Sequence, residues 1–260
     1  MLDTVDLSVG YREWAPPAAL RHALACLWVQ VVPGHGPLRT GLVLPDGCTD
    51  LVWEQGTGAF VAGPDTGPAP TLLPPGTVFA GVRFRPGAGG DALAVPLSEL
   101  RDLRVGLADV RRDLVRQLPA TLEPAAAVSA LTDAAGRLIA ERPPDAAILE
   151  AGRLLGRPAA RAEDVAAQVG LSSRQFRRRC ETAVGYGPKT LQRVLRFRRF
   201  VSLVDSAGWA AGGPAGGPGR LAQAAVDSGY ADQPHLTRET VRLAGLSPAA
   251  LIRERAGPGF

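Results

Sequence analysis

The chain has 260 residues, 46% of them hydrophobic, and a formal net charge of +4. This length and composition allow two domains with buried cores. No apolar run reaches the roughly 20 residues of a membrane span, and the first residues lack the basic start and apolar core of a signal peptide. Three cysteines, an odd number at wide spacing, argue against a disulfide framework. We therefore expect a cytoplasmic protein without membrane contact.

The first 118 residues are typical of a β-rich domain. Short apolar or alternating runs are separated by turns rich in Gly, Pro and Asp. These runs lie at 42–44, 51–53, 59–62 and 78–85. Their spacing predicts a small β-barrel or sandwich. Before the runs we expect a helix over 17–29, and after them a short helix that begins at Leu97.

An Ala-rich helix is predicted over 124–140, ending before Pro143 and Pro144. Its apolar stripe is either a dimer seam or intradomain core, with core the favoured interpretation. The fold class is therefore α+β, with two domains. We divide the chain into a β-rich domain (1–118), a helical linker or dimerisation segment (119–143) and an all-helical domain (144–260).

Two features of the β-rich domain suggest sites where chemistry or ligand binding could take place. Cys48, in a tight turn with His35 and Asp50 nearby in sequence, suggests a thiol-dependent enzyme, a methyl acceptor or a redox sensor that the helical domain delivers to its target. A metal site built from Cys26, His35 and Cys48 is a further alternative, but the sequence has no Cys-x-x-Cys or His-x-x-x-His spacing to support it. A buried thiol is the favoured alternative, so we expect no metal, no cofactor and no enzymatic activity. Arg83 and Arg85 share one strand face, which either binds an acidic ligand or, as we favour, faces solvent.

One pattern occurs twice near the C-terminus. A glycine turn is followed by a helix and a Gly-x-x-Pro stop, first from Gly170 to Pro188 and again from Gly229 to Pro248. Each copy is typical of a helix-turn-helix unit. In the first, Gly170 ends a short helix, and Ser172 and Gln175 form a capping box that opens the next.

The second helix of the first copy, over 173–182, carries Phe176 and Cys180 on one face and arginines elsewhere. Such a helix suits the major groove, where Arg bonds guanine or phosphate. The alternative is a solvated basic face. Residues 161–205 hold ten Arg or Lys against four Asp or Glu. Charge concentrated in this way favours a polyanionic partner.

A long helix from Pro188 to about Val204 joins the two copies, with an apolar stripe on one face and Arg193, Arg196 and Arg199 on another. It can hold two recognition helices for successive major grooves, about 34 Å apart. A Gly/Pro-rich insertion over 208–219 follows, and we expect it to be a flexible loop.

The repeated units, their linker and their stops resemble the AraC/XylS family of bacterial transcription regulators over residues 144–255. The resemblance implies about seven helices that bind a bipartite promoter site in double-stranded DNA, as activator or repressor. By position it assigns base readout to Ser173, Arg174, Arg177, Arg178, Asp232, Gln233, His235, Thr237 and Arg238. Arg178 and Arg238 could equally clamp phosphates. Cys180 and Thr240 replace the family's usual aromatic residues, which predicts smaller cores.

The segments 44–52 and 81–87 resemble, more faintly, an N-terminal sensor-like domain of actinobacterial regulators. The ligand of this domain is open at this point. RNA polymerase, a small-molecule effector and a second copy of the chain are further partners compatible with the resemblance.

Overall fold

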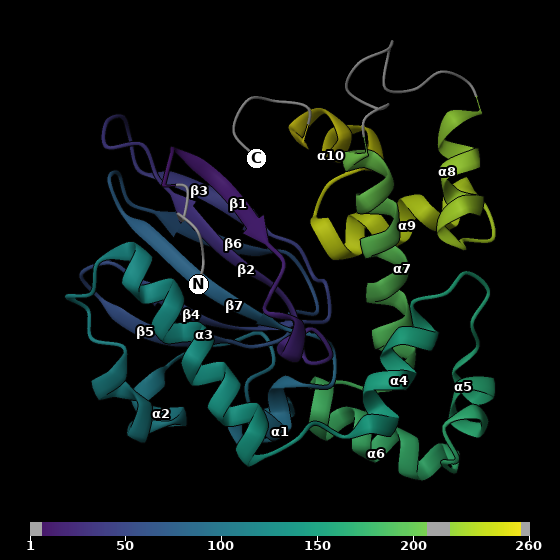
Figure 1. The fold of residues 1–260 in the computed structure, drawn as a ribbon. Coiled ribbons are helices and arrows are strands. Elements are labelled where there is room, and N and C mark those ends of the chain that lie inside the picture. The colour runs from purple at the N-terminus through teal and green to yellow at the C-terminus, as the bar shows by residue number, and fades with distance from the viewer. Residues whose placement is uncertain (1–6, 207–218, 256–260) are drawn as a thin grey trace.

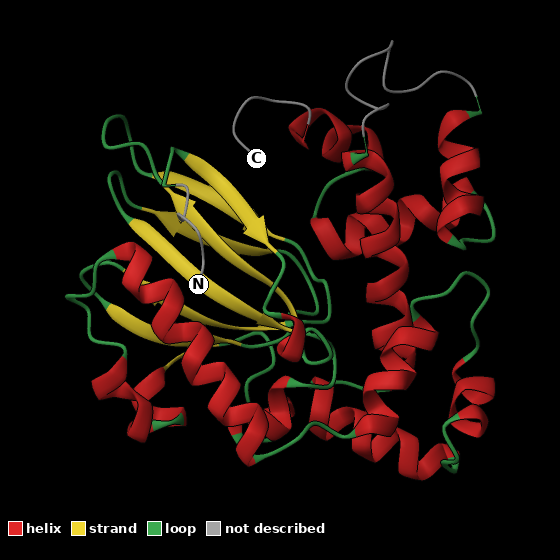
Figure 2. Cartoon of the chain, viewed as in Figure 1, coloured by secondary structure: helices red, strands yellow, loops and turns green. Residues whose placement is uncertain are grey.

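The computed structural model describes residues 7–206 and 219–255. A β-rich domain and a helical domain lie side by side (Figures 1 and 2). The α+β class is therefore confirmed, with strands in the N-terminal part and helices in the C-terminal part. The predicted insertion over 208–219 lies outside the described residues, except for Gly219.

Two antiparallel sheets form the β-rich domain. The larger has the strand order β1-β2-β7-β4-β5-β8, and the smaller pairs β3 with β6. Their bounds are β1 Gly10–Trp14, β2 Leu24–Val31, β3 Arg39–Val43, β4 Thr49–Glu54, β5 Gly58–Ala62, β6 Ala69–Leu73, β7 Val78–Phe84 and β8 Arg104–Gly106. The four predicted apolar runs correspond to β3, β4, β5 and β7.

The predicted helix over 17–29 is wrong. The structure has only the short 3-10 helix η1 (Ala18–Leu20) there, followed by the strand β2. Leu27 and Trp28 are both buried, although neighbouring residues of a strand point to opposite faces. Because β2 is covered on both faces, its apolar run does not alternate, and periodicity alone cannot distinguish such a strand from a buried helix.

Short helical segments connect the later strands. They are α1 (Gly89–Leu93), η2 (Leu97–Glu99), α2 (Leu107–Val110) and η3 (Arg112–Gln117). The Ala-rich helix is present as α3 (Pro124–Glu141), which crosses one face of the larger sheet (Figure 2). Its stripe, including Val128 and Leu131, lies in one core cluster with Trp53 of β4. The stripe is therefore intradomain core and is not available as a dimer seam.

The described part of the helical domain contains seven helices. They are α4 (Ala146–Leu155), α5 (Ala162–Gln168), α6 (Ser173–Val184), α7 (Pro188–Asp205), α8 (Arg220–Ser228), α9 (Gln233–Ala244) and α10 (Pro248–Arg255). A single cluster of buried residues runs through both helix-turn-helix units, with Phe197 of α7 fully buried in it. Cys180 and Thr240 are also fully buried. The smaller side chains thus sit at core positions, as predicted.

Candidate nucleic-acid interface

The first helix-turn-helix unit consists of α5, a turn and α6. Gly170 adopts a φ of +69° in this turn, a conformation that glycine adopts without steric cost. The Ser172 hydroxyl accepts a hydrogen bond from the Gln175 N–H at 3.3 Å, and the Gln175 side chain accepts one from the Ser172 N–H at 3.0 Å. The predicted capping box is therefore confirmed, and it fixes where α6 begins.

The outer face of α6 carries the predicted base-reading residues of this unit. Ser173, Arg174, Arg177 and Arg178 are all exposed, whereas Phe176 is buried beneath them. Arg177 pairs with Glu181 one turn later, at 2.9 Å. Arg174 and Arg178 form no ion pair within the described residues. Their guanidinium groups are thus free to meet a ligand.

Arg179, the last arginine of the same run, has a different role. Its Nε lies 2.6 Å from Oδ2 of Asp145, the residue that caps the N-terminus of α4. The Asp145 N–H in turn donates to Oδ2 of Asp91 in α1, at 2.9 Å. These contacts join α6 to the β-rich domain. Sequence reasoning missed this role, because nothing in the local sequence separates Arg179 from Arg178.

The second unit consists of α8, a turn at Gly229 and α9. Asp232 caps α9, since its Oδ1 accepts a hydrogen bond from the His235 N–H at 2.7 Å. The His235 ring packs edge-on against Tyr230, with centroids 5.2 Å apart. The Thr237 hydroxyl donates to the backbone oxygen of Gln233 at 3.0 Å. Asp232, His235 and Thr237 therefore have contacts within the unit.

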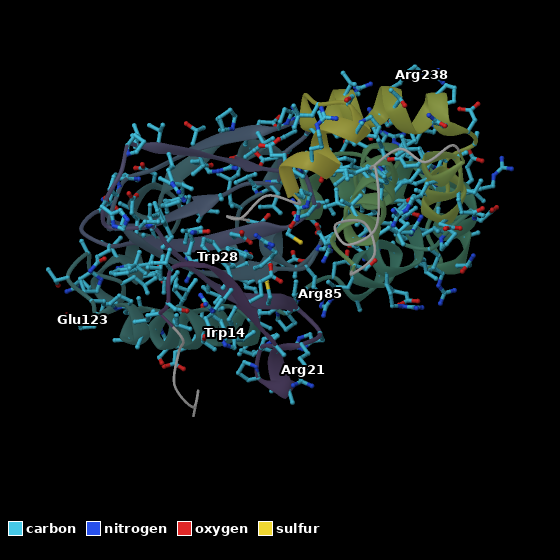
Figure 3. The ribbon with its side chains drawn as sticks, turned by 90° about the horizontal axis from the view of Figure 1, so that it is seen from above. Trp14, Arg21, Trp28, Arg85, Glu123 and Arg238 are labelled. Carbon is cyan, nitrogen blue, oxygen red and sulfur yellow. The ribbon has the colours of Figure 1, made fainter. Side chains whose placement is uncertain are left out.

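Two predicted residues of α9 are open to solvent. Gln233 and Arg238 are exposed, and Figure 3 shows Arg238 at the outer edge of the helical domain. Arg238 forms no ion pair within the part of the chain that the structure describes. The two units thus present comparable surfaces: a buried apolar face beneath free arginine side chains.

The arginines of α7 hold the second unit in place. Arg193 pairs with Glu239 of α9 at 2.7 Å, and Arg196 lies over the Tyr230 ring, 5.4 Å from its centroid. Arg199 donates to the backbone oxygens of Ser228 and Gly156. The predicted arginine face of this helix therefore connects helices and does not form a free basic surface.

Residues 165–254 match a family described as a helix-turn-helix domain. This match falls on α5 to α10, where the geometry gives two such units. The C-terminal helical domain is an AraC-type DNA-binding domain. Residues 12–106 match a domain of unknown function (DUF6597). No curated protein matches the chain.

Among solved structures, this AraC/XylS-type chain is similar to ToxT from Vibrio cholerae. A 1.65 Å structure of ToxT is 11% identical, with a TM-score of 0.48, and the match covers 87% of this chain and 98% of that one. A ToxT structure with a bound unsaturated fatty acid is 12% identical, with a TM-score of 0.42, and the match covers 88% and 95% of the two chains.

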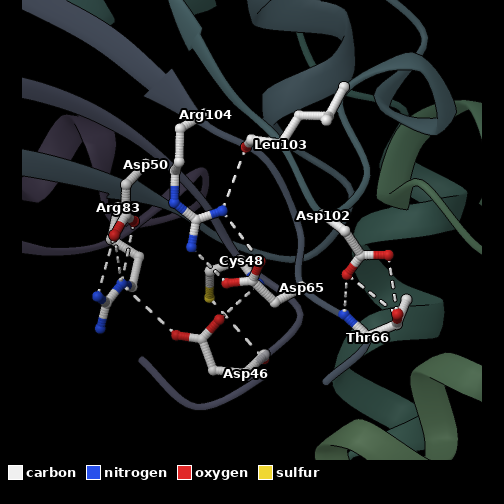
Figure 4. Close-up of polar contacts among 9 residues, drawn as sticks. All are labelled: Asp46, Cys48, Asp50, Asp65, Thr66, Arg83, Asp102, Leu103 and Arg104. Carbon is white, nitrogen blue, oxygen red and sulfur yellow. Dashed lines mark hydrogen bonds and ion pairs between the residues drawn. The ribbon is translucent and has the colours of Figure 1, made fainter. Parts of the chain in front are cut away.

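In the β-rich domain of this AraC/XylS-type chain, the prediction that Arg83 faces solvent is wrong. Its guanidinium pairs with Asp50 at 3.0 Å and Asp46 at 3.5 Å (Figure 4). It also pairs with Glu13 at 3.3 Å. The strand face opposite α3 is also covered, by a second apolar cluster that includes Trp28. Burial raises the pKa of Asp50, and the Arg83 charge acts against that shift. Arg85 is exposed, and its Nε donates to the backbone oxygen of Arg21 at 2.8 Å.

The Cys48 thiol is buried, with only 6% of the residue exposed. Burial raises the pKa of this thiol well above its ordinary value, with the nearby Asp46 carboxylate adding to the shift. A nucleophilic or redox-sensing cysteine needs accessible thiolate, so the geometry disfavours the thiol-dependent alternative. Within the described residues, no group of three or more His, Cys, Asp or Glu side chains is placed to hold a metal ion. None of the described helices is long and apolar enough to cross a membrane.

Proposed function

We propose that this regulator reads a bipartite promoter site, with α6 and α9 in adjacent major grooves of one duplex. The observation that carries the proposal is that both helices have arginines that form no ion pair with any described residue, while α7 is joined to both units. The first unit supplies most of the electrostatic attraction, because the basic residues are concentrated there.

The proposed base-reading set comprises the nine residues that the family resemblance assigns. In the first unit they are Ser173, Arg174, Arg177 and Arg178. In the second they are Asp232, Gln233, His235, Thr237 and Arg238. Arg174, Arg178, Gln233 and Arg238 have side chains free for bases. Asp232 in addition caps α9 through one carboxylate oxygen and so orients the helix.

We also propose that the N-terminal domain modulates DNA binding. The support is the path from Asp91 through Asp145 to Arg179, which ends on the recognition helix α6. A small-molecule effector bound by the N-terminal domain would act along this path by shifting α1 against α6. Such an effector changes DNA affinity only by its preference for one of the two arrangements.

Replacing Arg178 by Ala tests the first unit. An operator is selected from random duplexes with the full-length protein, and binding is measured by gel shift. We expect the variant to lose about 1–3 kcal/mol of binding free energy on this operator, with relaxed preference at one base pair. Arg112→Ala, an exposed arginine in η3, is the control and should bind as the wild type does.

A loss that is the same on every operator variant would mark Arg178 as a phosphate contact. No loss at all would remove α6 from the interface. If the wild-type protein enriches no sequence, the proposed function itself fails.

A further inference from the structure

One segment of the N-terminal domain, residues 97–103, is tied down beside the helical domain. Three hydrogen bonds fix it to the 63–66 turn. They join Gly63 N–H to Leu103 O at 3.0 Å, Asp102 N–H to Pro64 O at 3.2 Å, and Thr66 N–H to Asp102 Oδ1 at 2.6 Å. Figure 4 shows the Thr66–Asp102 pair. The segment is thus held by its own domain.

The backbone of this segment packs directly against Gly185, the residue that caps the C-terminal end of α6. A Cβ added to Gly185 would lie 2.6 Å from Cγ of Pro64 and 2.9 Å from the backbone oxygen of Leu97. Gly185 also has a φ of +94°, which disfavours other residues. The interface has no room for even a methyl group. Residues 97–103 therefore keep a fixed position relative to the recognition helix.

Two adjoining clefts open from this segment. The larger, about 820 Å³, is lined by Ser98 and Arg101 of the N-terminal domain together with Ser173 and Arg177 of α6. The smaller, about 390 Å³, is lined by Arg101 and, from α9, by Arg242, one turn after Arg238. Arg101 lines both clefts. It therefore lies between the cleft beside α6 and the cleft beside α9.

The acidic side chains that line these clefts are already engaged. Glu181 pairs with Arg177, and Glu163 lies 3.7 Å from Arg161. The Asp102 carboxylate accepts hydrogen bonds from the Thr66 N–H and hydroxyl. These carboxylates are thus occupied by partners other than Arg101.

Three cations of the clefts have no such partner. Arg101, Lys189 of α7 and Arg242 form no ion pair within residues 7–206 and 219–255. They come from three elements, one in the N-terminal domain and two in the helical domain. A cleft lined by positive charges attracts a polyanion.

We propose that Arg101 contacts a phosphate of the DNA backbone between the two major grooves that α6 and α9 enter. This inference rests on the proposed function, because it needs one duplex lying across both units. Between successive major grooves on one side of a duplex, the minor groove and its phosphates face the protein. Arg101 then adds affinity without sequence preference. The N-terminal domain is thereby part of the DNA interface.

The test compares Arg101→Ala with wild type in the full-length protein, on the selected operator, between 50 and 200 mM salt. Loss of one phosphate contact should reduce the slope of log affinity against log salt by about 0.9. Affinity should fall about 2- to 10-fold, equally on the operator and on its base-substituted variants. Arg101→Lys should keep most of the slope, because it keeps the charge. Arg116→Ala, an exposed arginine of η3, should leave the slope unchanged.

Thermal unfolding should show Arg101→Ala as stable as wild type, since the exposed side chain forms no ion pair with the residues that the structure describes. An unchanged slope and affinity would overturn the phosphate contact while leaving the proposed function intact. A loss confined to particular operator sequences would also overturn it, because that would mean base reading. Failure of the wild-type protein to bind any sequence preferentially would instead overturn the proposed function.

Discussion

Replacing Arg83 by Met should lower the free energy of unfolding by about 3–5 kcal/mol, as expected when one partner of a buried ion pair is removed. The variant leaves the Asp50 carboxylate, whose side chain is only 14% exposed, without its cation. Glu13 and Asp46 lose the same partner. Urea denaturation followed by circular dichroism measures the change. If the cost comes from an uncompensated charge, adding Asp50→Asn to this variant should recover part of it.

The Arg83→Met effect should also depend on pH. Burial raises the pKa of Asp50, and Arg83 counteracts this in the wild type. Without Arg83 the folded-state pKa rises further above the unfolded value, so the folded variant binds more protons than the unfolded chain. Stability then falls as pH rises through that interval. The variant should therefore lose more stability, relative to wild type, at pH 8 than at pH 5. Equal losses at both values would contradict this explanation.

Phe197→Ala should destabilise the helical domain by about 3–5 kcal/mol, the usual cost of removing a buried aromatic ring. Phe197 is fully buried in α7 and belongs to the core cluster that both units share. Because α7 fixes one unit against the other, we expect DNA affinity to fall together with stability. Thermal unfolding and gel shifts measure the two effects.

Ser202→Ala provides the matched control on the same helix. Ser202 is exposed, and such surface substitutions usually change stability by less than about 0.5 kcal/mol. Should Phe197→Ala melt at the wild-type temperature, the two units would not share one core. That result would contradict the packing described here.

The helix-turn-helix units could be predicted because their signals are local. The capping box of Ser172 and Gln175 and the glycine turn before it mark where α6 begins. The strand β2 could not be predicted in the same way, because burial on both faces removes the alternation that identifies a strand. The division into a β-rich and a helical part needed only turn chemistry and repeat spacing.

The polar contacts could not be predicted from the sequence, because they depend on tertiary structure. Arg83 meets carboxylates from residues 13, 46 and 50, which only the pairing of strands brings together. Arg179 and Arg178 are neighbours in one arginine run, yet only Arg179 reaches Asp145. No motif points to Arg101, because its position beside α6 follows from how the domains pack.

We infer that the two recognition helices α6 and α9, held together by α7, bind one face of a duplex. The most direct test lengthens the spacer between the two half-sites of the selected operator by about 5 base pairs, half a helical turn. We expect affinity for the lengthened operator to fall by about 10- to 100-fold, the equivalent of about 1.4–2.8 kcal/mol. On that operator, Arg238→Ala should cause no further loss of affinity. Full affinity on the lengthened operator, with Arg238→Ala still harmful, would contradict it.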